Sequence, residues 1–141
     1  MLSISVALCV FNGENFLREQ LLSIKKQNLL PDELVIFDDA STDSSLQIAK
    51  EFATTAPFKV KVISNHNNIG YVKNFELAIS FCEKDIIFMC DQDDIWAPSK
   101  LITVIAIFND EPSVGLILHD FYLIDSDNKL LPESTGTYGV N

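Results

Sequence analysis

The chain has 141 residues, of which 48% are hydrophobic, and it carries 20 acidic residues against 10 basic ones. This length suits one domain with a single core, so we expect one domain over residues 1–141. The acidic excess argues against a protein that binds nucleic acid along an extended surface, since such proteins need basic patches.

The apolar pattern alternates between strand-like and helix-like segments as far as residue 108. It predicts buried strands at 4–11, 34–37, 58–63 and 86–90, and helices after Asn15, after cap candidates at 41–43, over 72–81 and over 98–108. The order βαβαβαβ favours an α/β, Rossmann-like fold with a mainly parallel sheet flanked by helices.

Later in the chain, the pattern predicts two more strands, at 114–118 and 121–124, and then a hairpin turn at 125–128. The tail over 133–141 has little periodicity, and we expect it to be loosely ordered.

The cysteines and the hydropathy bear on the compartment. Cys9, Cys82 and Cys90 are odd in number and lie in apolar segments, which indicates reduced, buried thiols. No run of about 20 apolar residues predicts a membrane span. We therefore expect a cytoplasmic protein. Contact with the inner face of the membrane, through a further C-terminal part, is an open alternative.

Polar clusters follow three of the predicted strands. They begin at Asn12, at Asp38 and at Asp91. Because the carboxyl ends of parallel strands line one crevice, which is where ligands bind in open α/β sheets, we expect the three clusters to converge.

Asp91 and Asp93 stand at positions i and i+2, so an extended chain would direct both carboxylates to one side. Such oxygen ligands suit Mg²⁺ or Mn²⁺, held by one or two carboxylates together with substrate phosphates. The alternative is that acids after a strand only cap the next turn. A fully apolar strand that delivers three acids to one place favours the metal.

Two further clusters keep two interpretations each. Asp38 and Asp39 either cap the following helix or accept hydrogen bonds from a base or a ribose. Lys73 either meets a phosphate or is a solvated surface lysine, while Gly70 is predicted to have the positive φ that turns the loop into its helix. His66 and His119 are weak signals for a ligand site.

Four segments together resemble a known family. They are VALCVFNG at 6–13, DDASTD at 38–43, NNIG at 67–70 with KNF at 73–75, and DQDDIWAP at 91–98. Their order and spacing resemble the family 2 inverting glycosyltransferases with the GT-A fold, and the match looks closest to bacterial rhamnosyltransferase-like members.

The resemblance implies a nucleotide diphosphate-sugar donor, and transfer of its sugar with inversion to a glycan or lipid-linked acceptor in polysaccharide biosynthesis. Asp91 and Asp93, with Asp94 beside them, would hold Mn²⁺ or Mg²⁺ on the diphosphate. The residues implied in nucleotide-sugar binding are Val10, Asn12, Asp38, Asp39, Asn68, Gly70, Lys73, Asn74 and Gln92.

The sequence departs from the family pattern in two respects. Cys9 stands where relatives often carry Thr or Ser near the base. The catalytic base of the family normally lies well downstream of the metal motif, and neither Asp120 nor Glu133 is assigned that role. We therefore expect the acceptor-binding part to be missing, and the chain to bind donor without completing transfer at a useful rate.

Two other functions compete with a glycosyltransferase. A sugar-phosphate nucleotidyltransferase should carry a Gly-rich, basic phosphate loop after the first strand, and the turn at 11–14 has one Gly and an acid. A non-catalytic module that binds nucleotide-sugars stays open on the sequence alone.

Overall fold

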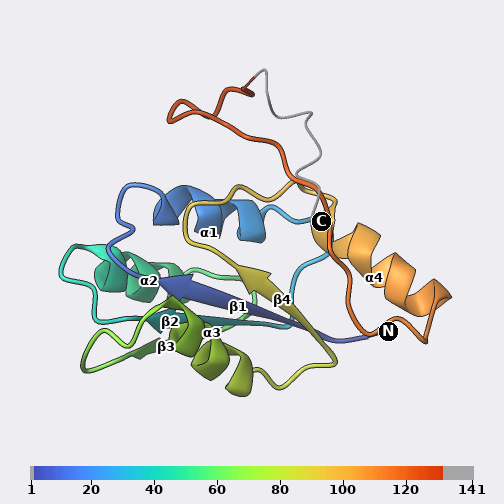
Figure 1. Ribbon diagram of the computed structural model, residues 1–141, viewed down its shortest axis with the longest axis horizontal. Helices are drawn as coiled ribbons and strands as arrows, with labels where there is room; N and C mark the ends of the chain where they lie inside the picture. Colours follow the sequence, from blue (N-terminus) through green and yellow to red (C-terminus); the bar gives the residue numbers. More distant parts are fainter. Residues whose placement is uncertain (1, 132–141) are drawn as a thin grey trace. The chain divides into compact units, whose positions relative to one another are not determined.

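The computed structural model describes residues 2–131, and its chain divides into two units, Met1–Asp110 and Glu111–Asn141 (Figure 1). Helices and strands alternate through the first unit. The strands are β1 (Ile4–Val10), β2 (Glu33–Asp38), β3 (Lys59–Ser64) and β4 (Ile86–Cys90), and the helices are α1 (Leu17–Lys25), α2 (Ser45–Ala53), α3 (Tyr71–Ser80) and α4 (Lys100–Asp110).

The strands form a four-stranded sheet in the order β3-β2-β1-β4, and all of its pairs are parallel. Every residue of β1 and β2 is buried, which is why these strands are apolar runs rather than alternating patterns. The predicted α/β fold with a parallel sheet is confirmed. The predicted strand bounds hold to within one residue at each end.

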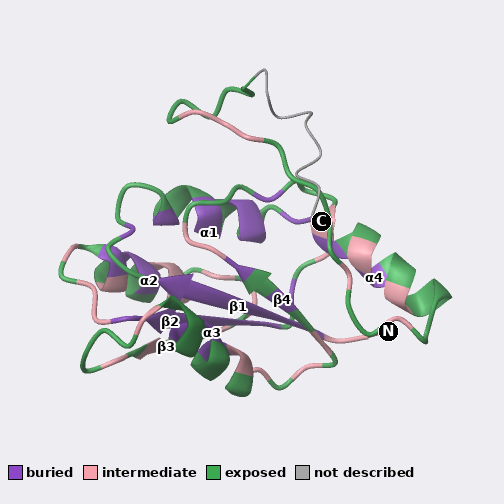
Figure 2. Cartoon of the chain, in the orientation of Figure 1, coloured by how far each residue is buried: buried purple, intermediate pink, exposed green. Residues whose placement is uncertain are grey.

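Helices cover both faces of the sheet (Figures 1 and 2). On one face, Val6 and Leu8 of β1 pack with residues of α1, α2 and α4, such as Leu21, Ile48 and Leu101. On the other face, α3 packs alone against β1 and β2 through Phe75 and Ala78. A fully buried aliphatic side chain contributes about 1.5–3 kcal/mol, so this two-sided core fixes the sheet that carries the strand ends.

The cysteines are free of disulfides, as expected. Cys9 and Cys90 are buried within the two core layers, while Cys82 is partly exposed. Within residues 2–131, no helix combines the length and the apolar character that a membrane crossing requires.

Helix starts differ from the sequence prediction by a few residues. α1 begins at Leu17 rather than near Asn15, because the amides of Phe16 and Leu17 both bond to the carbonyl of Gly13, each at 3.0 Å. α2 begins at Ser45, whose amide donates to Asp43 Oδ1 at 2.9 Å. Local turns thus take up residues that periodicity alone assigns to the helices.

The strands predicted at 114–118 and 121–124 are wrong for the part of the second unit that the structure describes. Leu116 is 75% exposed and Leu118 85% exposed, so their apolar side chains meet no covering layer within that unit. A strand also needs a hydrogen-bonded neighbour along its length. The expectation for 133–141 lies outside the described residues.

The hairpin turn predicted at 125–128 is present. The amide of Asn128 donates to the carbonyl of Asp125 at 3.0 Å, and Asn128 takes a φ of 62°. An antiparallel bridge between Ile124 and Leu130 closes this turn.

Candidate functional site

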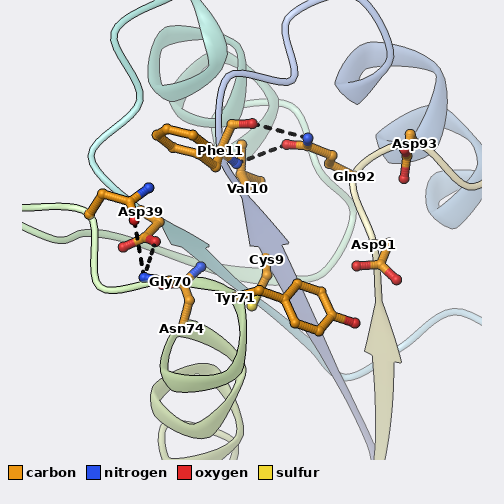
Figure 3. A pocket seen from close by; sticks show the side chains of 11 residues that line it. Cys9, Val10, Phe11, Asp39, Gly70, Tyr71, Asn74, Asp91, Gln92 and Asp93 are labelled. Carbon is orange, nitrogen blue, oxygen red and sulfur yellow. Dashed lines mark hydrogen bonds between the residues drawn. The ribbon is translucent and has the colours of Figure 1, made fainter.

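A pocket lies at the carboxyl ends of β1, β2 and β4, beside the first turn of α3 (Figure 3). Its cavity measures about 440 Å³, which is within the range of small-molecule sites. Eleven residues line it: Cys9, Val10, Phe11, Asp39, Asn68, Gly70, Tyr71, Asn74, Asp91, Gln92 and Asp93. Of the three predicted clusters, those that begin at Asp38 and Asp91 contribute residues to this crevice, whereas the cluster that begins at Asn12 does not line it.

The end of β1 forms a neutral wall of this pocket. Burial, together with the charges of Asp91 and Asp39, raises the pKa of the Cys9 thiol to about 12, although a hydrogen bond with Asn74 opposes the rise. Cys9 is thus a protonated, uncharged group at neutral pH. Phe11 also lines the pocket, and 44% of its surface is exposed.

Asp39 organises the loop between β3 and α3. Its Oδ1 accepts hydrogen bonds from Asn65 Nδ2 at 2.8 Å and from the amide of Ile69 at 2.9 Å, and its Oδ2 accepts one from the amide of Gly70 at 2.9 Å. Asp39 is buried. A carboxylate can accept about four hydrogen bonds, so three donors leave it capacity for one from a ligand.

The start of α3 is fixed by two polar contacts. Asn74 donates from Nδ2 to the carbonyl of Phe37 at 2.9 Å, and its Oδ1 accepts from Asn65 at 2.9 Å. Gly70 has a φ of 88°, which confirms the predicted positive value. Since L side chains rarely adopt that conformation, a glycine at this position is what lets the loop enter the helix beside the pocket.

Two acids that follow β4, Asp91 and Asp93, line the pocket. Among the described residues, no ion pair involves Asp91 or Asp93. Burial raises the pKa of Asp91, and the charges of Asp94 and Asp93 raise it further. Concentrated negative charge on oxygen ligands is the donor set that a hard divalent cation prefers, so these residues fit Mg²⁺ or Mn²⁺.

The protein supplies few metal ligands at this position. Within residues 2–131, no group of three or more His, Cys, Asp or Glu side chains is arranged to hold a metal ion by itself. The acids therefore suit an ion that takes one or two carboxylates from the protein and its remaining ligands from phosphate oxygens and water.

Gln92 lies between the two acids and reaches across to β1. Its Oε1 accepts a hydrogen bond from the amide of Phe11 at 2.8 Å, and its Nε2 donates to the carbonyl of Phe11 at 3.1 Å (Figure 3). Both polar ends of the amide are thus bonded to the backbone of one residue.

Comparison with known proteins decides the family. The family described as Glycosyl transferase family 2 matches residues 5–135, nearly the whole chain. The chain belongs to glycosyl transferase family 2. The resemblance carried by the four motifs is thereby confirmed.

Relatives and solved structures agree with this family. The chain is 28% identical over 134 residues to an uncharacterized glycosyltransferase of Nostoc sp., covering 95% of this chain and 41% of the relative. It is 35% identical over 108 residues to the dTDP-rhamnosyl transferase RfbG of Shigella flexneri, covering 72% of this chain and 37% of RfbG. The chain thus spans about two fifths of these relatives.

A solved structure gives the same fold. Staphylococcus aureus TarS in complex with UDP superposes with a TM-score of 0.71 at 28% identity, over 79% of this chain and 33% of that one. The sheet and its flanking helices are those of the GT-A glycosyltransferases, which confirms the predicted GT-A fold.

Some of the residues that the motifs implicate line the pocket of this family 2 chain, and others do not. Those at the pocket are Val10, Asp39, Asn68, Gly70, Asn74, Asp91, Gln92 and Asp93. Those that do not line it are Asn12, Asp38, Lys73 and Asp94.

Three of the residues outside the lining have other contacts or lie at the surface. Asn12 accepts the amide of Thr42 on its Oδ1 at 2.8 Å. Asp38 is buried and accepts from Ser64 Oγ at 2.9 Å. Lys73 is exposed on α3. Asp38 thus bonds to the end of β3, and α2 begins only at Ser45, so Asp38 does not cap that helix. The exposure of Lys73 favours the surface interpretation for this residue.

Sequence reasoning did not identify Phe11 and Tyr71 as site residues. Each aromatic adjoins a position of special backbone geometry, since Asn12 has a φ of 48° and Gly70 a φ of 88°. In the sequence, both residues are aromatic side chains next to a predicted turn, and this position could have indicated that they lie at the site. Burial raises the pKa of Tyr71, and the charges of Asp91 and Asp94 add to this effect, so its phenol stays a hydrogen-bond donor.

Proposed function

We propose that the pocket binds the nucleoside diphosphate part of a nucleotide-sugar, and that the protein transfers the sugar to a glycan or lipid-linked acceptor with inversion. The observation that carries the proposal is the position of an uncompensated acid pair, Asp91 and Asp93, at one end of a pocket whose other parts are neutral or internally bonded. An anionic diphosphate enters such a place only together with a cation.

The nucleoside is assigned to the side of the pocket formed by β1 and Asp39. Phe11 presents an exposed ring on which a base can stack, and base–aromatic stacking is worth about 1–3 kcal/mol. Asp39 lies in the same lining with remaining acceptor capacity for an imide N–H or a ribose hydroxyl. TarS, which has this fold, is known with UDP and supports this assignment.

The diphosphate is assigned to the side formed by Asp91, Asp93 and Tyr71. The two carboxylates would hold Mn²⁺ or Mg²⁺, which neutralises the charge of the departing nucleoside diphosphate when bound. The phenol of Tyr71, kept protonated, can donate to a phosphate oxygen or a sugar hydroxyl. The acceptor hydroxyl, attacking the anomeric carbon from the opposite side, would give inversion.

Metal-dependent binding is the first test. We expect UDP, GDP or dTDP to bind at least tenfold more tightly in Mn²⁺ than in chelator, as measured by calorimetry on the full chain. Asp93→Asn should remove most of that difference, because it removes a ligand charge from the acid pair. Asp110→Asn, the same change on an exposed residue at the end of α4, is the matched control. Equal affinity in Mn²⁺ and chelator would return these acids to a capping role.

Transfer itself needs a second test, because binding alone does not separate an enzyme from a nucleotide-sugar-binding module. Labelled nucleotide-sugars, offered with glycan and lipid-linked acceptors to a longer version of the protein, should yield a glycoside whose anomeric configuration, read by NMR, is opposite to that of the donor. A product with retained configuration would refute the inverting mechanism.

A further inference from the structure

The pairing between β1 and β4 stops before β1 ends. The last matched pair is Leu8 with Cys90, whereas β1 continues to Val10. Beyond that pair, the side-chain amide of Gln92 meets the backbone of Phe11 with one acceptor and one donor, at 2.8 and 3.1 Å. A side-chain amide thus supplies an acceptor and a donor to the backbone just beyond β1, where the backbone pairing with β4 has ended.

Gly13 makes room for this amide. A Cβ built on Gly13 would coincide with the Oε1 and Cδ atoms of Gln92. Among the glycines in the described residues, Gly70 is the one with positive φ, so Gly13 is required for space rather than for its conformation. The chain therefore provides both the reaching side chain and the gap that receives it.

We propose that Gln92 is a positioning residue, which holds the acid pair at a fixed place relative to the β1 wall. Asp91 and Asp93 are its immediate neighbours, so anchoring Gln92 to Phe11 anchors the backbone that carries both carboxylates. This inference rests on the proposed function and deepens it: the amide sets the separation between the base end and the diphosphate end of the site. Both polar ends of that amide bond to the backbone of Phe11, and through these bonds Gln92 acts on the position of the acids.

Gln92→Met tests the role, because methionine has a similar length and no hydrogen-bonding amide. The measured quantity is the metal enhancement, defined as the nucleoside diphosphate Kd in chelator divided by the Kd in Mn²⁺, determined with whichever of UDP, GDP and dTDP binds the wild type. Loss of two neutral hydrogen bonds should lower this ratio by about tenfold. A variant that is only less stable has fewer folded molecules, which leaves the ratio unchanged.

Gly13→Ala perturbs the same contact from the other side without removing a polar group. Its methyl group displaces the Gln92 amide, so the enhancement ratio should fall in the same direction. The double variant should show no more than the larger single effect, because both changes break one interaction. Gln47→Met, on an exposed helix residue bonded to Glu51, and Gly115→Ala, where a Cβ meets open space, are the matched controls.

Amide hydrogen exchange supplies a readout without ligand. The Phe11 amide, which donates to Gln92, should exchange about tenfold faster in Gln92→Met, while the Val6 amide within β1 should not change. Unchanged Phe11 exchange, a retained enhancement ratio in Gln92→Met, or multiplicative effects in the double variant would each overturn the positioning role. A wild type without metal enhancement would instead overturn the proposed function, and this role with it.

Discussion

Glu33 at the start of β2 is buried and Asp91 just after β4 is half-buried, and the two acids lie at opposite ends of one parallel sheet. Glu33 is 0% exposed, accepts Ser5 Oγ at 2.7 Å, and lies 3.2 Å from the ammonium group of Lys61. Although burial opposes it, hydrogen bonds from Ser5, the amide of Glu83 and Lys61 lower the pKa of Glu33. The pKa of Asp91 is raised instead.

The difference separates two uses of a carboxylate charge. At the amino ends of the strands the chain supplies its own cation, so the charge of Glu33 is part of the folded structure. At the carboxyl ends the chain supplies none to Asp91 or Asp93 within the described residues, and the charge is left for a ligand to neutralise. Asp39 is an intermediate case, because backbone amides of Ile69 and Gly70 compensate it.

The largest effect on stability is expected at the amino ends. Glu33→Gln should lower the free energy of unfolding by about 3 kcal/mol, because it leaves Lys61 without its buried partner and the amide cannot accept all of the former donors. Urea unfolding measures this loss. Glu83→Gln, on the exposed partner of Lys61, should cost much less. A similar loss in both variants would show that Glu33 is not a special structural charge.

The pH dependence of stability sharpens the same point. Since the pKa of Glu33 is lower in the folded state, its contribution is fully present above its unfolded pKa, near 4.5, and is lost as pH falls through the folded value. The stability difference between wild type and Glu33→Gln should therefore shrink below about pH 4.5. A difference that stays constant down to pH 3 would contradict the assignment.

Asp39→Asn probes the intermediate case, with an expected cost of about 2 kcal/mol. The substitution places an amide donor where the Ile69 and Gly70 amides already donate, so the loop beside α3 loses bonds to a charged acceptor. We expect nucleoside diphosphate affinity to fall by about 1.5–3 kcal/mol as well, measured by calorimetry. A variant that loses stability but keeps its affinity per folded molecule would make Asp39 a structural residue only.

Asp91→Asn should have the smallest effect on stability and the opposite sign. Removing a charge that Asp94 and Asp93 repel should leave the free energy of unfolding unchanged or raise it by up to about 1 kcal/mol. Nucleoside diphosphate affinity in Mn²⁺ should nevertheless fall. If Asp91→Asn is destabilising to the extent of Glu33→Gln, the contrast between the two ends of the sheet fails.

The sequence predicts the sheet well because its central strands are buried on both faces and therefore appear as apolar runs. It underestimates β2 at both ends, where Glu33 and Asp38 are polar but buried. Their partners, Ser5 and Ser64, belong to other strands, so no local window reveals that burial is compensated. Likewise, the apolar residues near Leu116 fit the pattern of a strand, but the pattern does not show which other strand would pair with it.

The candidate site is predictable to the level of strand ends and no further. Acids that follow a strand in a parallel sheet must come together, and Asp39, Asp91 and Asp93 do. Which neighbours face the pocket depends on helix phase, since Asn74 points inward and is buried while the adjacent Lys73 is exposed. The contact of Gln92 with Phe11 joins residues 81 positions apart. One residue belongs to the motif at 6–13 and the other to the motif at 91–98, so neither motif by itself predicts the contact.

The strand order also has a consequence for how the molecule assembles. β1, β2 and β3 pair with one another and all lie before α3 in the chain. Asp39 likewise bonds to the amide of Gly70, which directly precedes α3. β4 joins the other side of β1, and its pairs, such as Ile4 with Ile86, join residues that lie far apart in the chain. During synthesis, a nascent chain that has emerged as far as Ser80 contains the residues of the nucleoside side of the pocket, but it lacks the acid pair until the segment after β4 has emerged.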